Sequence, residues 1–566
     1  MKRHSLAANR RAMLKGAAFA VSGIAIPILS GEASASTASG QRRNDKHDAV
    51  TAGAGVAQAD TRFGKVAGYI RDEIFAFKGL PYGDTTGGAN RFMPPRPAKP
   101  WAGVRSSRSY GPVAPQDKGT GRLNDEEAFL FQWNDSYEGE DCLRVNVWTP
   151  GIADGAKRPV MVWLHGGGFA AGSGNDLPAF DGHNLAKRGD VVVVTLNHRL
   201  NLLGFLDLSA HGDAYAHSGN VGMLDIVAAL EWVRDNIANF GGDPNCVTIF
   251  GQSGGGAKVS TLMGMPSAKG LFHRAIVQSG SFRLSNTQER SRKLGDLILK
   301  ELGVSGNDLT RLQTIPYAEL RRASETVLAR ENKPMGPVID MRRMASNLGF
   351  GPVLDGDVLP ASPFGPDAPE MTADVPMLIG TTLNEFASGI NHPEYEAMTM
   401  AELGERLKGM FGDRAETVLA TFRKRTPDIS PFDLWSRIAS ARVRMGAVEQ
   451  ATSKAALNRA PAYLYWFTWQ TRVLDGRPRA FHCAEIPFVF ANAEICEHMT
   501  GGGPRAAALE AKVAGAWIAF ARTGNPNHRG IPEWRPYAPA TQPTMLLDDT
   551  CRLANHIDSE ELASLG

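Results

Sequence analysis

The chain has 566 residues, of which 43% are hydrophobic and 21% charged, and its formal net charge is +2. These values are typical of a folded globular protein that is long enough for a large buried core. Because no charge run or basic stripe is present, composition gives no reason to expect a nucleic-acid partner.

The first 35 residues have the pattern of an export signal. Arg10 and Arg11 precede an apolar run from Gly16 to Leu29, and Ala33–Ala35 offers small residues to a signal peptidase. The run of about fourteen residues is short for a membrane span, so we expect cleavage and no stable membrane anchor. We therefore predict a twin-arginine signal peptide over 1–35 and a periplasmic or secreted protein. The signal carries a net charge of +4, which leaves −2 on the mature chain.

The next segment, residues 36–58, is rich in small and polar residues and is predicted to be a flexible leader. We assign the folded domain to residues 59–566. It begins with a predicted hairpin of Val66–Ile70 and Ile74–Lys78. A long irregular segment, dense in Pro and Gly, follows from Leu80 to Gln116. No internal repeat or linker divides the rest, so a single large domain is expected.

Strand and helix patterns then alternate. Pro159–Leu164 and Asp190–Leu196 are continuous apolar runs, which are typical of strands covered on both faces of a parallel sheet. Apolar residues between Gly222 and Asn239 recur at helical spacing. This succession predicts an α/β fold with a large, mostly parallel sheet. The remaining predicted elements are strands at Cys142–Trp148, Val247–Phe250, Ala275–Gln278, Val375–Thr381 and Tyr463–Trp469, a largely helical stretch from Gly280 to Asn347, and a helix at Ala507–Ala521.

A candidate nucleophile lies where one predicted strand ends. The strand Val247–Phe250 runs into Gly251–Gly255, which has the G-x-S-x-G pattern with Ser253 at its centre. Such a turn strains the central residue and needs glycines two positions away on either side. The serine hydroxyl then stands above the sheet at the start of a helix. The alternative, a Gly-rich loop after a core strand, lacks this strand–turn–helix context.

Backbone donors for a developing negative charge are predicted after an earlier strand. His165–Phe169 reads His-Gly-Gly-Gly-Phe and directly follows Pro159–Leu164. Glycines let the backbone approach a substrate and turn its N–H groups toward it. We assign Gly167 and Gly168 as donors, together with the amide of Gly254. The alternative is a loop that is Gly-rich only because it turns tightly.

A serine nucleophile needs a base that is oriented by a carboxylate, and in this type of fold the chain order is Ser, acid, His. Candidate bases are therefore His273, His392, His482, His498, His528 and His556. We favour His482, which follows a predicted strand through a Gly/Pro-containing loop. For the acid we favour Glu385, just beyond Val375–Thr381, over Asp355 and Asp357.

The cysteines and histidines predict no metal site. The five cysteines, at 142, 246, 483, 496 and 551, are scattered and form no C-x-x-C or zinc-type spacing. An odd, scattered set is also not a disulfide framework, and Cys142 and Cys246 are expected to be buried thiols. We expect the chemistry to require no metal and no organic cofactor.

These motifs together resemble the type B carboxylesterases, which include para-nitrobenzyl esterases, cholinesterases and the non-catalytic neuroligins. The resemblance rests on Phe240–Gly255, Glu140–Pro150 and Phe77–Tyr82, with further matches at Asn384–Phe386 and at His482 with Glu485–Phe488. It covers about residues 60–555. It implies an α/β-hydrolase fold, a Ser253–Glu385–His482 triad and the same backbone donors. It also implies that Ser279 forms hydrogen bonds beside the triad.

The chain departs from the family pattern at several positions. Gln252 stands where the family usually has Glu, Gly254 where it usually has Ala, and Arg144 replaces a common aromatic residue. Ala114 stands where many eukaryotic relatives have a cysteine. Cys142 therefore lacks that disulfide partner and is expected to be a free thiol.

The resulting hypothesis is a serine carboxylesterase that acts on a small-molecule ester through an acyl-enzyme. A hydrolase of amides or carbamates would use the same residues, so the sequence leaves that alternative open. A neuroligin-like binding protein is the alternative from another class, but the chain retains all three triad positions. Walls of the substrate pocket are expected from 85–135, 285–350 and 395–450, and Phe169 is either a wall or a core residue. The natural ester, stereochemical preference and oligomeric state stay open.

Overall fold

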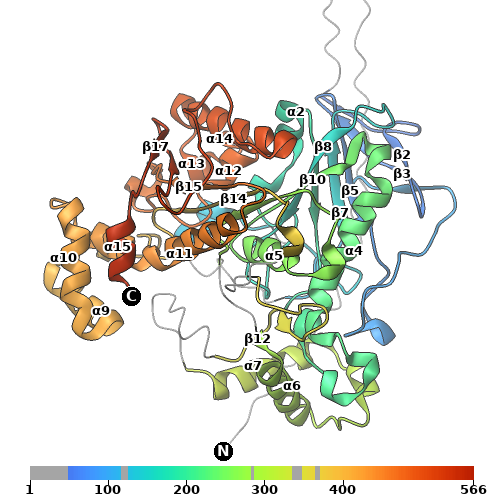
Figure 1. Ribbon diagram of the computed structural model, residues 1–566. Helices are drawn as coiled ribbons and strands as arrows, with labels where there is room; N and C mark the ends of the chain where they lie inside the picture. The colour runs from blue at the N-terminus through green and yellow to red at the C-terminus, as the bar shows by residue number, and fades with distance from the viewer. Residues whose placement is uncertain (1–48, 117–124, 135, 282–285, 334–346, 364–369) are drawn as a thin grey trace, which may run out of the picture. The chain divides into compact units, whose positions relative to one another are not determined.

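The computed structural model describes residues 49–116, 125–134, 136–281, 286–333, 347–363 and 370–566 (Figure 1). The predicted signal peptide and the leader up to residue 48 lie outside these ranges. The last part of the predicted leader contains strand β1 (Val50–Thr51) and the first residue of β2 (Gln58–Thr61). Regular structure therefore begins earlier than the sequence predicts.

A twelve-stranded sheet lies at the centre of the described chain (Figure 1), in the order β1-β4-β5-β7-β9-β8-β10-β11-β14-β15-β16-β17. Neighbouring strands from β9 to β16 are parallel, whereas the pairs at both edges are antiparallel. The strands after β1 are β4 Tyr69–Arg71, β5 Ile74–Pro81, β7 Arg144–Thr149, β8 Arg158–Leu164, β9 Val192–Leu196, β10 Gly242–Gln252, β11 Arg274–Gln278, β14 Met377–Thr382, β15 Ala462–Phe467, β16 Thr544–Leu547 and β17 Arg552–Ala554. The smaller sheets comprise β2, β3 (Gly64–Ala67) and β6 (Val104–Ser106), and β12 (Asn286–Thr287) with β13 (Val353–Leu354).

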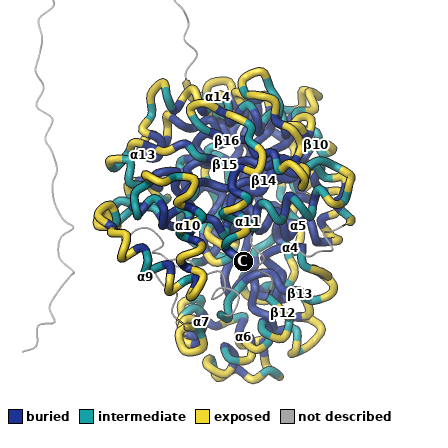
Figure 2. Tube along the Cα trace, turned by 60° about the vertical axis from the view of Figure 1, so that its left-hand side comes forward, coloured by how far each residue is buried: buried dark blue, intermediate teal, exposed yellow. Residues whose placement is uncertain are grey.

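Helices cover both faces of the central sheet, which explains its continuous apolar strands. In β8, Val160 and Val162 belong to the core on one face, while Met161 and Trp163 belong to the core on the other. Helices α4, α5 and α11 contribute to the first core, and α2, α12 and α14 to the second. Figure 2 shows the sheet strands buried beneath a more exposed helical surface.

The helices have the following bounds: α1 Asp125–Phe131, α2 His183–Gly189, α3 Asn201–Phe205, α4 Val221–Asn236, α5 Gly254–Met263, α6 Gln288–Glu301, α7 Tyr317–Glu331, α9 Met400–Phe411, α10 Ala415–Arg425, α11 Pro431–Ala456, α12 Ile486–Val489, α13 Glu497–Thr500, α14 Gly503–Thr523 and α15 Ser559–Ser564. Helices α6 and α7 belong to one separate apolar cluster, and α9 and α10 pack with the start of α11 in another. None of the helices in the described ranges is long and apolar enough to cross a membrane.

The predicted α/β sheet is confirmed, and most predicted strands lie within a few residues of the observed ones. Three details differ. Strand β10 already begins at Gly242, five residues before the predicted strand, although its pairing with β8 is irregular between Gly242 and Val247. The segment from Leu80 to Gln116 is mostly irregular but contains β6, and the C-terminal strands β16 and β17 have no counterpart in the prediction.

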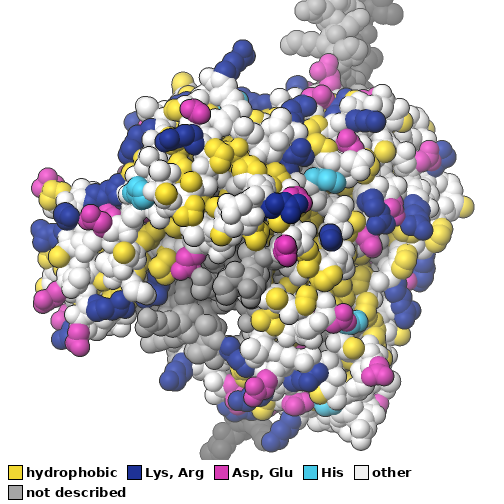
Figure 3. Space-filling model, in the orientation of Figure 1, with side chains coloured by type: hydrophobic (Ala, Val, Ile, Leu, Met, Phe, Trp, Pro, Cys, Tyr) yellow, Lys and Arg dark blue, Asp and Glu magenta, His cyan; other side chains and the backbone are white. Residues whose placement is uncertain are grey.

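The charged side chains at the surface can be compared with the charge pattern of the sequence, which contains no basic stripe. On the face in Figure 3, basic and acidic side chains are interspersed over the described residues, without a continuous basic stripe.

All five cysteines are free thiols, and Cys142 is fully buried. The expectation of a buried Cys246 is wrong, because that residue is only partly buried. Its sulfur lies 3.2 Å from Arg274 Nη1, near the N-terminal end of β11.

Candidate active site

Ser253 occupies the turn between β10 and α5. It is the residue before the helix and has φ 58° and ψ −124°, a backbone conformation that non-glycine residues rarely adopt. Its amide donates to the Gln278 carbonyl of β11 at 2.8 Å, and its carbonyl accepts from Ala257 at 3.0 Å. The strained turn is therefore fixed on one side by the sheet and on the other by the helix.

Close packing of three backbone segments explains the glycines around Ser253. A Cβ on Gly255 would overlap the Leu164 carbonyl oxygen at the end of β8, and one on Gly251 would lie 2.5 Å from the Gly255 carbonyl carbon. A Cβ on Gly254 would overlap the backbone of Gly168. The turn and the loop after β8 are thus in direct contact, which only residues without side chains permit.

The glycine loop presents backbone N–H groups at this contact. Gly167 and Gly168 have φ 78° and 63°, so both peptide planes are turned in a way that favours glycine. Within the described ranges, the amides of Gly167, Gly168 and Gly254 have no hydrogen-bond partner. Three free donors therefore meet beside the strained serine, an arrangement suited to an oxygen that becomes negatively charged.

A partly buried histidine, His482, and a buried carboxylate, Glu385, form a pair at the ends of two neighbouring strands. Glu385 follows β14, and His482 lies on the loop that follows β15. His482 Nδ1 lies 2.5 Å from Glu385 Oε2, and the His482 amide donates to the Glu385 carbonyl at 3.1 Å. With Nδ1 as donor to the carboxylate, the ring's Nε2 is left as a proton acceptor.

The Glu385 carboxylate is held from several sides. Its Oε1 accepts hydrogen bonds from Ser279 Oγ at 2.7 Å and from the Thr382 amide at 2.8 Å. The Glu385 amide donates to Ser440 Oγ on α11 at 2.9 Å. The side chain is only 2% exposed, so these bonds fix the carboxylate in a site from which water is largely excluded. Ser279 thus lies where the resemblance implies, in contact with the acid.

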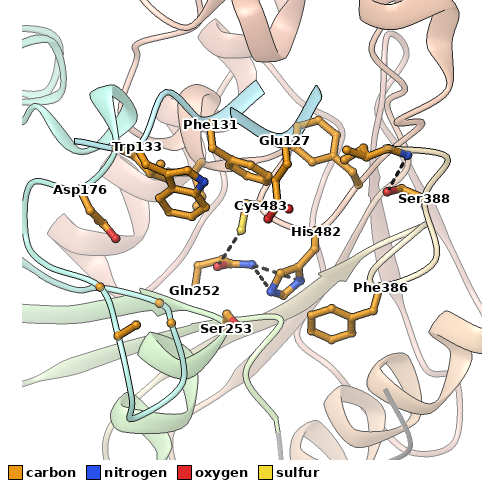
Figure 4. A pocket seen from close by; sticks show the side chains of 18 of the residues that line it. Glu127, Phe131, Trp133, Asp176, Gln252, Ser253, Phe386, Ser388, His482 and Cys483 are labelled. Carbon is orange, nitrogen blue, oxygen red and sulfur yellow. Dashed lines mark hydrogen bonds between the residues drawn. The ribbon is translucent and has the colours of Figure 1, made fainter. Parts of the chain in front are cut away.

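Gln252, rather than Ser253, lies within hydrogen-bond distance of the His482 ring. Its Nε2 lies 3.2 Å from His482 Nε2 and 3.3 Å from Nδ1, and its Oε1 accepts from Cys483 Sγ at 3.2 Å (Figure 4). The hydroxyl of Ser253 has no hydrogen-bond partner in the described part of the chain. Serine and histidine nevertheless line the same cavity. The sequence predicts neither contact of Gln252. The signal that could have drawn attention to this residue is that Gln252 stands where the family usually has Glu.

The rival catalytic residues have other surroundings. The Asp355 carboxylate accepts from Asn220 and from the amides of Asp357 and Leu359, so it stabilises a turn. His273 accepts from the Val247 amide. Of the histidines after Ser253, only His392 and His482 are among the described residues that line the cavity, and His392 is exposed and bonded to Glu394.

The cavity above Ser253 has a volume of about 1080 Å³. Its described walls come from 113–138, from the glycine loop, from 386–395 and from the start of α11. The helical region 285–350, expected to form a wall, contributes none of the described lining residues. Phe169 is not among the described lining residues; it is partly buried and packs against the core, edge-on to Phe205. The aromatic lining residues are Phe131, Trp133, Tyr137, Phe180, Phe386, Tyr395, Phe432, Trp435 and Phe481.

Buried ionisable groups surround the site and were not predicted as functional. Burial raises the pKa of Glu485, three residues after His482, to about 7, and that of Asp176, a cavity-lining residue, to about 7. Burial also raises the pKa of the Cys483 thiol well above its ordinary value, so this thiol stays protonated. The described residues contain no cluster of His, Cys, Asp or Glu suited to a metal ion.

The close contact at Gly255 predicts a large loss of stability when a methyl group is added. Gly255→Ala should lower the free energy of unfolding by more than about 3 kcal/mol, because a backbone carbonyl occupies the required space. The measurement is urea unfolding followed by circular dichroism. The matched control is Gly404→Ala in α9, where the added Cβ meets no atom within 4 Å and should stabilise by about 0.5–1 kcal/mol. Equal unfolding midpoints for both variants would contradict the described packing.

Comparison with known proteins gives a consistent result. The model of the carboxylesterase family matches residues 56–429 and 432–565. The chain is 34% identical over 508 residues to the para-nitrobenzyl esterase of Bacillus subtilis (strain 168), which covers 89% of this chain and 97% of that protein. It is 34% identical over 513 residues to the phenmedipham hydrolase of Pseudarthrobacter oxydans, with coverages of 89% and 96%.

The chain is also similar in three-dimensional structure to esterases whose structures have been solved. A carboxylesterase of Geobacillus stearothermophilus has a TM-score of 0.74 at 35% identity and covers 90% of this chain and 100% of its own. An esterase from Clostridium hathewayi, described as able to hydrolyse aliphatic aromatic polyesters, has a TM-score of 0.76 at 37% identity, with coverages of 90% and 97%. The chain therefore belongs to the carboxylesterase family, has the α/β-hydrolase fold and is a carboxylic ester hydrolase.

Proposed function

We propose that this esterase works through a Ser253–His482–Glu385 triad and an acyl-enzyme intermediate. The observation that carries the proposal is a strained serine beside three free backbone amides, in a cavity that is also lined by a histidine bonded to a buried carboxylate. In this arrangement Ser253 Oγ attacks the ester carbonyl carbon while His482 Nε2 takes the hydroxyl proton. The amides of Gly167, Gly168 and Gly254 stabilise the oxyanion.

The second half of the reaction reverses these roles. The His482 imidazolium, stabilised by Glu385, gives its proton to the departing alcohol. His482 then takes a proton from the water that attacks the acyl carbon, and it passes this proton to Ser253 Oγ as the Oγ–acyl bond breaks and the acid leaves. Every proton is carried by His482 and every oxyanion is held by the same three amides. This chemistry calls on no metal or organic cofactor.

Gln252 has to release His482 before the attack. In the structure its carboxamide occupies the acceptor Nε2 that the Ser253 hydroxyl requires. Catalytic hydrogen bonds often form only in the complex with substrate, so a small rotation of either side chain completes the triad. Gln252 keeps its bond to Cys483 on the other side, which limits how far it moves.

The aromatic cavity lining supports esters with an aromatic acyl or alcohol part as substrates. Flat apolar walls bury aromatic groups over a large area and favour edge-on or offset contacts with them. We expect kcat/KM for benzyl esters to exceed that for the matching ethyl esters at least tenfold. Equal values for the two series would contradict this preference.

The triad itself is tested with p-nitrophenyl esters. Ser253→Ala should lower kcat by roughly three to six orders of magnitude, and Glu385→Gln, which keeps the shape but removes the charge, by about two to four. Ser305→Ala, an exposed surface change, serves as the matched control and should retain activity. A fully active Ser253→Ala variant would show that another residue is the nucleophile. Matching p-nitroanilides, assayed in parallel, measure whether amides are also substrates.

We also propose export through the twin-arginine route, on the evidence of Arg10, Arg11 and the apolar run that follows. Replacing both arginines by lysine keeps the charge but removes the pattern that the receptor reads. The esterase should then disappear from the periplasmic or extracellular fraction of the producing cells and accumulate inside. Unchanged export of the double variant would refute the route.

A further inference from the structure

A lysine is buried beneath the glycine loop, in a helix that is otherwise apolar there. Lys258 lies on α5, five residues after Ser253, and its side chain is 0% exposed. Its Nζ donates to the His165 carbonyl at 2.9 Å and lies 5.7 Å from the centre of the Phe169 ring. These residues are the first and last of the segment His165–Phe169, so the ammonium lies against both ends of the loop that carries Gly167 and Gly168.

The two histidines next to Lys258 are neutral and do not balance its charge. The rings of His165 and His198 stack with centres 5.1 Å apart. Each Nδ1 lies against a backbone carbonyl, Gly166 O at 2.9 Å and Arg199 O at 2.7 Å, so each Nδ1 carries the proton. Burial, with Lys258 adding to it, holds the pKa of both histidines well below its usual range.

Among the described residues, Asp176 is the one carboxylate whose charge acts on Lys258. It lines the active-site cavity, and its Oδ1 is buried without a hydrogen-bond partner in the same ranges. The strongly paired Arg199 and Asp225 lie beyond His198 and neutralise each other. In the part of the chain that the structure describes, Asp176 is therefore the charged group that acts on Lys258, and His165 and His198 are its neutral neighbours.

We propose that Lys258 is a positioning residue of the oxyanion hole, which it supports in two ways. Its hydrogen bond to the His165 carbonyl fixes the loop that presents Gly167 and Gly168. Its buried positive charge acts through the loop on the substrate oxygen as that oxygen becomes negative. The inference rests on the proposed function, because it assigns the lysine a role toward the same backbone amides.

The expected effect is moderate, since the charge acts at a distance. We take roughly 10 Å as the separation between the ammonium and the oxyanion, because two to three residues, each spanning at most about 3.6 Å, separate the His165 carbonyl from the loop amides. A unit charge at about 10 Å in a medium with an effective dielectric constant of about 20 changes the rate roughly tenfold. Loosening of the loop adds to this loss, so a total decrease in kcat of about 10- to 100-fold is expected.

The arrangement also predicts a specific dependence on pH. Burial lowers the pKa of Lys258 to about 7, and Asp176, whose own pKa burial raises to about 7, opposes this shift in its ionised form. The ammonium is charged below this pKa and loses its proton as the pH rises through it. The wild-type kcat should therefore contain a decrease on the alkaline side that belongs to Lys258, distinct from the acid-side loss when His482 becomes protonated.

The experiment compares the full chain with Lys258→Met, Lys258→Arg and Asp176→Asn. For each, kcat, KM and their pH profiles are measured with a p-nitrophenyl ester, together with the inhibition constant of a matching aryl trifluoromethyl ketone, which forms a tetrahedral oxyanion on the serine. Lys258→Met should lower kcat about 10- to 100-fold with KM little changed, weaken the ketone by the same factor and lose the alkaline decrease. Lys258→Arg should retain most of the rate and move the decrease above pH 10, because guanidinium stays protonated.

Asp176→Asn keeps the lysine but removes its counter-charge, so the alkaline decrease should shift to lower pH. If Lys258→Met does not fold, the kcat–pH profiles of Lys258→Arg and Asp176→Asn test the proposal instead. The proposal is overturned if the alkaline decrease is unshifted in both variants. A folded Lys258→Met with wild-type kcat, profile and ketone affinity also overturns it. Ser253→Ala, measured alongside, separates the two hypotheses: its full activity would refute the proposed function, whereas an inactive Ser253→Ala beside a wild-type-like Lys258→Met would refute only the role of the lysine.

Discussion

The close backbone contact between the turn at Ser253 and the end of β8 is the constraint on which the site depends. Gly255 lies against the Leu164 carbonyl, and Gly254 lies against Gly168, so the strand that carries the serine and the loop that carries the amides cannot separate without opening the sheet. The parallel pairing of β8 with β10 brings these two segments to the same edge. The strained backbone of Ser253 persists because the sheet, the helix and the loop all fix it.

Charge is distributed around this contact in a way that suits ester hydrolysis. A fully bonded carboxylate, Glu385, contacts His482, the residue that becomes positively charged in the proposed mechanism. On the proposed reading a buried ammonium, Lys258, lies on the side of the oxygen that must become negative. Fixed charges and dipoles of this kind stabilise a transition state because they need no reorganisation as the reaction proceeds. The neutral Gln252, bonded to His482, leaves the carboxylate of Glu385 as the nearest negative partner of the imidazole.

The fold and much of the site could be predicted from the sequence because both rest on local patterns. Runs such as Asp190–Leu196 are typical of strands covered on both faces, and the glycines around Ser253 lie at contacts that leave no room for side chains. The positions of His482 and Glu385 could be predicted because each residue follows the end of a strand, and the carboxyl ends of parallel strands lie at the same edge of the sheet. The short strand Thr544–Leu547 escaped prediction, since its pairing with β15 stabilises it and its own four residues carry little signal.

Contacts between residues far apart in the chain account for what the sequence did not reveal. Lys258 in an apolar helix and Gln252 before the serine are both visible as anomalies, but their partners, His165 and His482, lie about 90 and 230 residues away. The walls of the cavity were assigned partly to 285–350, whereas the described walls come from 113–138 and from 386 onward. Helices α6 and α7 pack with α3 in an apolar cluster apart from the cavity, and no local sequence pattern distinguishes such helices from a lid over the site.

Covalent labelling tests the central claim most directly. The protein is incubated with a fluorophosphonate that carries an aryl group, and the site of modification is located by mass spectrometry of its peptides. The account predicts one phosphonyl group per chain, on Ser253, with loss of esterase activity in proportion to labelling. An enzyme that loses its activity while the label lies on another residue, or that hydrolyses esters without ever being labelled at Ser253, would contradict it.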